Sequence, residues 1–166
     1  MDSLQFLLTP STPIQTPALV FLLGSLTVSS LSDLKRMAAQ ADFAEVWAAF
    51  TGFMFLSDVY FGVAGQLPLI PFVVKWVMIL LFAAATTQTH LFAISTMDVA
   101  ALTALLAILS PVYILLAMIL TLIVNELLQP ILRKYGEAGA YPFLPTVLAV
   151  NLLVLLLIEA GGIEML

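Results

Sequence analysis

The chain has 166 residues, of which 63% are hydrophobic and only 9% are charged. A water-soluble domain contains about 45–50% apolar and about 25% charged residues, so this composition excludes an ordinary soluble domain and indicates a protein that folds in lipid. The net charge of −5 is spread thinly over the chain, which excludes a basic nucleic-acid-binding surface, and the absence of cysteine excludes disulfides, thiol catalysis and Fe–S clusters.

Six apolar runs, taken in chain order, predict six transmembrane helices, because about 20 mostly apolar residues cross a bilayer. Residues that interrupt apolar helices separate the runs. A charged cluster follows Leu31, and Pro111 and Pro130 follow the fourth and fifth runs. An open sheet would leave backbone polar groups unpaired in hydrocarbon, so we expect an all-α integral membrane protein with a single polytopic domain. The expected spans cover about residues 17–31, 43–60, 67–85, 94–109, 112–128 and 143–158.

The basic residues predict how these spans are oriented. Lys35 and Arg36 follow the first span, and Arg133 and Lys134 follow the fifth. In a six-span topology these two loops share one side of the membrane, and short loops rich in Lys and Arg face the cytoplasm. We therefore expect a multi-pass protein of the cell membrane, surrounded by membrane lipid, with both termini outside.

Two acidic residues lie at the cytoplasmic ends of the expected spans. Asp33 follows the first span and Asp98 opens the fourth, so this topology puts both at the same depth. Two carboxylates within hydrogen-bond range share a proton, so that one accepts a proton from water while the other protonates a carbonyl, as in aspartic proteases. This chemistry needs no metal and no cofactor. The alternative for Asp98 is a first-turn acid favoured by the helix dipole, with Ser95 or Thr96 capping the same helix.

The residues around both acids share features with a family of membrane proteases. Small residues precede the first acid, and a basic pair and a Trp follow it, in Ser29, Ser30, Ser32, Asp33, Lys35, Arg36 and Trp47. The second acid lies in "STMDVAALTALLAILSP", and a "PFLP" run precedes the last span. These features resemble the prepilin and preflagellin (archaellin) peptidases, membrane aspartic proteases of the GxGD type, with Ser95 and Met97 at the glycine positions.

The resemblance implies a divergent aspartic endopeptidase of archaeal type, with Asp33 and Asp98 as its catalytic pair. The implied partner is a precursor protein that bears a class III signal peptide. The enzyme would remove this signal segment at the cytoplasmic face and leave the hydrophobic stretch that follows on the mature subunit. Candidate supporting residues at the same face are Lys35, Arg36, Ser95, Thr96 and Glu126.

Other charged residues allow different functions. Asp58 in the second span and Lys75 in the third come out at similar depth, which favours an ion pair between these spans over a transport path. His90 stands in a loop without partner ligands, so a metal site is not expected. The rival functions are a small polytopic transporter component, for which Asp58 and Lys75 would be central, and a catalytically silent membrane scaffold.

Overall fold

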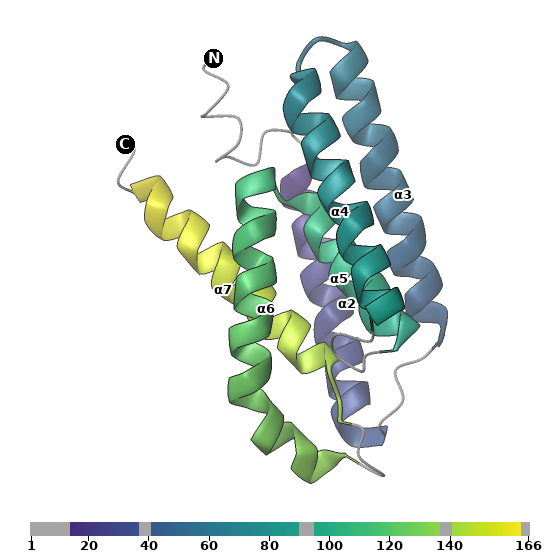
Figure 1. Cartoon of the computed structure of the whole chain (residues 1–166), viewed down its shortest axis with the longest axis vertical. Helices are drawn as coiled ribbons and strands as arrows, with labels where there is room; N and C mark the ends of the chain where they lie inside the picture. Colours follow the sequence, from purple (N-terminus) through teal and green to yellow (C-terminus); the bar gives the residue numbers. More distant parts are fainter. Residues whose placement is uncertain (1–13, 37–40, 90–94, 137–140, 164–166) are drawn as a thin grey trace.

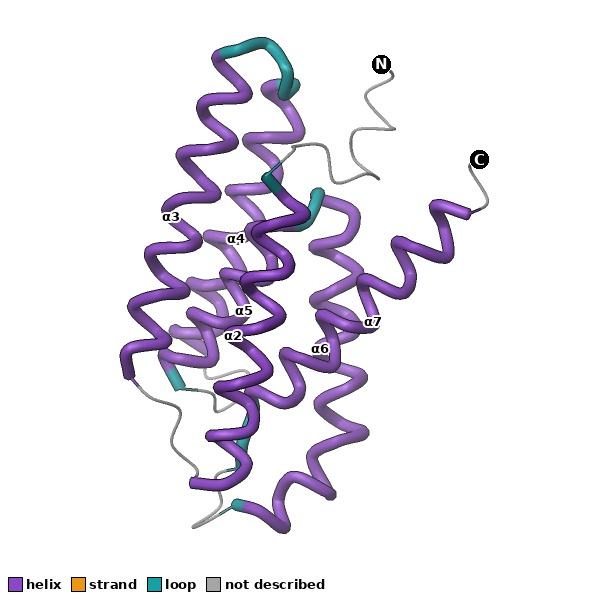
Figure 2. Tube along the Cα trace, turned by 180° about the vertical axis from the view of Figure 1, so that it is seen from behind, coloured by secondary structure: helices purple, strands orange, loops and turns teal. Residues whose placement is uncertain are grey.

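The computed structural model describes residues 14–36, 41–89, 95–136 and 141–163, which form a bundle of α-helices (Figure 1). The helices are α2 (Gln15–Arg36), α3 (Ala41–Val63), α4 (Leu69–Thr89), α5 (Thr96–Ile108), α6 (Pro111–Leu132) and α7 (Leu144–Ile163), and the 3₁₀ turn η1 (Arg133–Tyr135) follows α6. The described residues contain no strand, as the view from behind shows (Figure 2). The expected all-α class is therefore confirmed for this part of the chain.

Four of the described helical segments are long and apolar enough to cross a membrane, namely Pro17–Lys35, Asp42–Val63, Leu69–Thr87 and Pro111–Tyr135. Only 22% to 33% of each apolar window is buried inside the protein, so most of the large apolar side chains point outward. Leu56 and Leu80 are typical, with 66% and 67% of their surface exposed. An outer surface this apolar requires lipid around it, and the chain is therefore a membrane protein.

The helix α5 differs from these segments because most of its residues are buried. It has 13 residues, so at about 1.5 Å per residue it is shorter than the hydrocarbon layer of about 30 Å. Helices α2, α3, α4 and α7 all pack against it. Small side chains at Ala101, Ala104 and Ala107 let the surrounding helices approach closely. The core of the bundle is thus built around α5.

Substitution of Leu105 by alanine should reveal this central role. Leu105 lies in α5 and is fully buried, so Leu105→Ala leaves a cavity. Because lipid surrounds the bundle, the cost does not include transfer of the side chain to water. We therefore expect the free energy of unfolding to fall by about 2 kcal/mol, the lower end of the range for Leu→Ala in soluble cores. Thermal unfolding in detergent micelles measures this loss. Leu81→Ala on α4 is the matched control, because Leu81 is 65% exposed and its truncation should leave the melting temperature unchanged.

Two helices continue past the residues that were expected to break them. The charged cluster was expected to end the first span at Leu31, but α2 runs on to Arg36, since the carboxylate of Asp33 finds a partner in the bundle. The fifth span was expected to stop before Pro130, yet α6 includes this proline and ends at Leu132. A proline removes one backbone hydrogen bond, which the last turn of a helix tolerates at the cost of a bend (Figure 1).

The third helix begins two residues later than expected, because a tight turn precedes it. Gly65 adopts a φ of 71°, a left-handed conformation that glycine reaches without steric cost. The amide of Gln66 then donates to the carbonyl of Phe61 at 2.9 Å, which closes the end of α3. Leu67 belongs to this turn, and α4 starts at Leu69.

Candidate active site

Asp33 lies near the C-terminal end of α2, where its side chain contacts the start of α7. Its exposed fraction is only 8%. The backbone amide of Leu144 donates to Oδ2 of Asp33 at 3.3 Å, and the backbone of Phe143 also hydrogen-bonds this carboxylate. The first amides of a helix lack partners within the helix and carry partial positive charge. The N-terminus of α7 therefore holds the buried carboxylate of Asp33 in place.

Asp98 lies in the first turn of α5 and takes part in a capping box with Ser95. The side chain of Ser95 accepts from the Asp98 amide, and the amide of Ser95 donates to Oδ2 of Asp98 at 2.8 Å. The Ser95 hydroxyl donates to the same oxygen at 2.8 Å. Asp98 is 8% exposed, so burial and two hydrogen bonds fix its side chain. The first-turn role anticipated for this acid is present in the structure.

The two acids come together at one end of the bundle. The end of α2 and the starts of α5 and α7 all lie in the lower half of Figure 1. The charge of Asp33 acts electrostatically on the carboxyl group of Asp98. Two buried acids that interact in this way repel one another when both are ionised. Protonation of one of them removes the repulsion, and general acid–base chemistry by a pair of carboxyl groups requires one protonated and one ionised member.

The candidate supporting residues do not all join this pair. Lys35 is exposed at the end of α2, and the side chain of its neighbour Arg36 lies outside the described residues. Thr96 is exposed, and so is Glu126 on α6. Among the candidates whose side chains the structure describes, Ser95 is the one that hydrogen-bonds an acid of the pair.

Asn125, the neighbour of Glu126 on α6, is a buried polar residue. Its side-chain oxygen accepts a hydrogen bond from the hydroxyl of Tyr141 at 2.8 Å, and Asn125 itself is 6% exposed. This contact joins α6 to the segment that leads into α7. It holds in place the helix start that binds Asp33.

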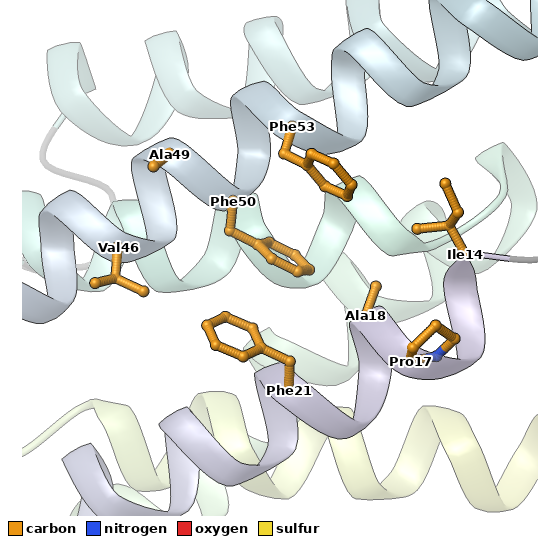
Figure 3. A pocket seen from close by; sticks show the side chains of 8 residues that line it. All are labelled: Ile14, Pro17, Ala18, Phe21, Val46, Ala49, Phe50 and Phe53. Atoms are coloured by element: carbon orange, nitrogen blue, oxygen red, sulfur yellow. The ribbon is translucent and has the colours of Figure 1, made fainter.

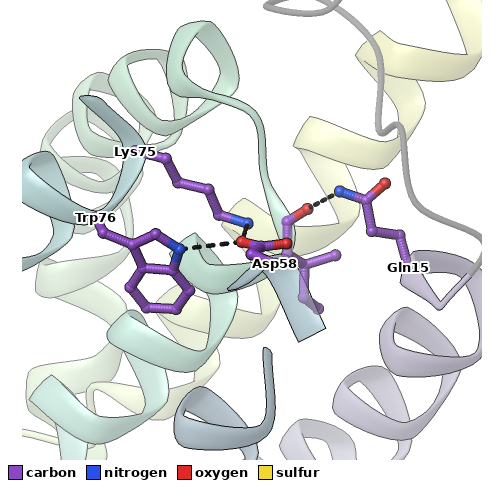
Figure 4. Close-up of polar contacts among 5 residues, drawn as sticks. Gln15, Asp58, Lys75 and Trp76 are labelled. Atoms are coloured by element: carbon purple, nitrogen blue, oxygen red, sulfur yellow. Dashed lines mark hydrogen bonds and ion pairs between the residues drawn. The ribbon is translucent and has the colours of Figure 1, made fainter. Parts of the chain in front are cut away.

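A second buried polar cluster joins α3 and α4 (Figure 4). Nζ of Lys75 lies 2.7 Å from Oδ2 of Asp58, and Nε1 of Trp76 donates to the same oxygen at 3.0 Å. The structure thus brings together the two residues that were expected to form an ion pair. In the same view, Nε2 of Gln15 donates to the carbonyl of Ile108 at 2.9 Å. This bond satisfies an orphan carbonyl at the end of α5 and fixes the start of α2 beside it.

An apolar pocket of about 500 Å³ separates α2 from α3 (Figure 3). The rings of Phe21 and Phe50 stack across it, with centroids 5.6 Å apart. Nε1 of Trp47 donates to Oγ of Ser25 at 3.1 Å, which ties the two helices together. The pocket has no acid or base in its lining, so it offers no catalytic group. Its lining residues are Ile14, Pro17, Ala18, Phe21, Val46, Ala49, Phe50 and Phe53.

No pattern in the sequence predicts that the start of α7 binds Asp33. A partial signal lies in Pro145, the second residue of α7, because proline is common in the first turn of a helix. This proline indicates that the amides of Leu144 and Phe143 lie at the start of a helix. It could not show that α2 would pack there.

No family model, curated protein or solved structure matches the chain. Within the described ranges, no group of three or more His, Cys, Asp or Glu residues is placed to hold a metal ion, and His90 lies outside these ranges. The functional proposal therefore depends on the two buried carboxylates at one end of the bundle.

Proposed function

We propose that the protein is a membrane aspartic endopeptidase in which Asp33 and Asp98 activate water. Its substrate class is a precursor protein with a class III signal peptide, as for the prepilin and preflagellin peptidases that the sequence resembles. The observation that carries the proposal is the electrostatic interaction between two buried acids that come from separate parts of the chain. Burying two like charges together costs free energy, and such perturbed acids are candidates for a functional site.

The reaction needs one proton on the pair of acids and one water molecule. The ionised carboxylate takes a proton from water while the water oxygen bonds to the peptide carbonyl carbon, and the protonated carboxyl gives its proton to the carbonyl oxygen. The resulting gem-diol returns a hydroxyl proton to one acid as the other acid protonates the amide nitrogen. The C–N bond then breaks, which releases an acid and an amine, and the pair again carries one proton.

The proposal includes a six-span topology with both termini outside and the acids at the cytoplasmic face of the cell membrane. Support comes from Lys35, Arg133 and Lys134, which are exposed at the ends of α2 and α6. These ends lie at the same end of the bundle as the start of α5 (Figure 1). Short loops rich in Lys and Arg face the cytoplasm, where water for hydrolysis is available.

The direct test is cleavage of a pilin-like precursor by the protein in liposomes. We expect a product that has lost its signal segment and kept its hydrophobic stretch, as measured by mass spectrometry of the intact polypeptide. Heat-unfolded protein in the same liposomes is the control and should leave the precursor intact. A precursor whose mass does not change in the presence of folded protein would contradict the proposal.

A catalytically silent scaffold is the second candidate function, and one observation favours it. Each acid already has a structural role, since Asp33 binds the start of α7 and Asp98 caps α5. Acids at helix starts stabilise those helices without any chemistry. Substitutions that keep the caps and remove the acidity separate the two functions.

A further inference from the structure

Three buried side chains in the helix pair α2 and α7 have polar atoms without a hydrogen-bond partner among the described residues. These atoms are Oγ of Ser30, Oγ1 of Thr146 and Nδ2 of Asn151. The two helices pack against each other. Elsewhere in the described residues the same is true of Oγ of Ser57 on α3. The unsatisfied groups therefore concentrate in the helix pair that holds Asp33.

Two of these atoms lie within one helical turn of the hydrogen bond between α2 and α7. Ser30 precedes Asp33 by one turn on α2, and residues three apart lie on the same face of a helix. Thr146 belongs to the first turn of α7, as does Leu144, whose amide donates to Asp33. Ser30 is 3% exposed and Thr146 is fully buried. One buried hydroxyl on each helix thus lies within a helical turn of the residues that join Asp33 to Leu144.

Buried hydroxyls of this kind normally have a partner. Serine and threonine in helices can satisfy their hydroxyls by donating to a carbonyl of the preceding turn. Ser29 does this, with its Oγ 2.8 Å from the carbonyl of Ser25, whereas the neighbouring Ser30 does not. Where protein groups do not pair a buried polar atom, an ordered water usually does, provided that it finds two to four polar partners.

We propose that Ser30, Thr146 and Asp33 bind a water molecule between α2 and α7. The two hydroxyls and the carboxylate give this water three polar partners, which is the usual number for a buried water. If the protein is the proposed protease, this water is the one that the acids activate, and that second part depends on the proposed function. Ser30 and Thr146 then position the water oxygen, while Asp33 accepts its proton.

The binding of water is tested by a double-mutant cycle in thermal unfolding, which needs no enzymatic activity. Ser30→Ala and Thr146→Val each remove one hydroxyl at nearly constant shape. We expect each change to lower the melting temperature. The double variant should melt at no lower temperature than the less stable of the two single variants, because either change alone already releases the water. Ser57→Ala combined with Thr146→Val is the control pair, and its effects should add.

Ser30→Thr keeps the hydroxyl and should retain the coupling to Thr146. An unchanged or raised melting temperature in Thr146→Val would overturn the water site, since an unpaired hydroxyl gains from replacement by a methyl group. Strictly additive losses for Ser30 and Thr146 would overturn it as well.

Kinetics separate the water site from the proposed function. With an active protease, both hydroxyl variants should lower kcat and leave KM unchanged, and an unchanged kcat would overturn the role of this water in hydrolysis. A parent protein that cleaves no precursor would overturn the protease and the hydrolytic role together. The unfolding cycle then still decides whether the water is bound.

Discussion

Replacement of either Asp33 or Asp98 by asparagine is expected to abolish precursor cleavage while the protein stays folded. Asparagine has nearly the shape of aspartate, and its side-chain oxygen can still accept the amide hydrogen bonds of Leu144 and Ser95. It cannot exchange a proton with water. General acid–base groups contribute about 10²–10⁴-fold to a rate, and the loss of either acid removes both steps of the mechanism, so we expect cleavage to fall by at least that factor.

The measurement is the initial rate of product formation in liposomes, with thermal unfolding of each variant alongside. Asp42→Asn is the matched control, because Asp42 is an exposed acid in the first turn of α3, and its loss should leave cleavage unchanged. Wild-type cleavage rates in Asp33→Asn or Asp98→Asn would show that the pair is not catalytic.

Alanine at the same positions distinguishes the protease from the silent scaffold. Asp33→Ala and Asp98→Ala remove the helix-capping oxygen as well as the acidity, and loss of such a cap costs about 0.5–2 kcal/mol. Both candidate functions therefore expect the alanine variants to melt earlier than the asparagine variants. Only if the protein is a protease should the asparagine variants, at nearly native stability, lose the precursor cleavage that the parent protein shows.

The topology predicted that the two acids share a depth, whereas it predicted neither their proximity nor their partners. The order of spans and the positions of the basic loops were enough to predict that Asp33 and Asp98 lie at one end of the bundle. The binding of Asp33 to the start of α7 depends on how α2 and α7 pack, and no periodicity in either segment encodes that contact. For the same reason the sequence offered Glu126 as a supporting acid, although the buried residue there is Asn125.

Whether serine can replace the first glycine of the GxGD pattern depends on the backbone conformation, which the sequence does not show. A serine at the first position removes the conformational freedom of glycine, which matters only if the backbone needs it. Ser95 has φ −76° and ψ 162°, an extended conformation that any residue adopts. Its side chain instead caps α5 and donates to Asp98. The local structure around the acid is therefore compatible with serine.

Helix ends were predicted less well than helix positions, because tertiary contacts decide them. A charged cluster normally ends an apolar span, but a partner for Asp33 lets α2 continue. A proline normally ends a helix, but Pro130 lies close enough to the end of α6 for the last turn to form. The local patterns favour an end at both places. A contact with α7 extends α2, and the position of Pro130 in the last turn lets α6 continue.

Removal of the charge of Lys75 is expected to be the most destabilising single change in the helix pair α3 and α4. Asp58 and Lys75 are 1% and 6% exposed, and Lys75→Met would leave the carboxylate of Asp58 buried with Trp76 as its remaining described donor. Breaking a buried ion pair from one side costs about 3–5 kcal/mol. For a chain of this size we expect the melting temperature to fall by roughly 6–20 °C.

Thermal unfolding in micelles measures this loss, with Lys35→Met as the control, because Lys35 is exposed at the end of α2 and surface changes are worth about 0.5 kcal/mol or less. The exchange variant, Asp58→Lys with Lys75→Asp, restores a pair of opposite charges in the same place. It also deprives Nε1 of Trp76 of its acceptor on α3, so the exchange should recover part of the lost stability and not all of it. An exchange variant that melts as early as Lys75→Met would show that the cluster depends on its exact geometry and not on charge pairing. A Lys75→Met variant with native stability would exclude a structural ion pair and favour the transport path.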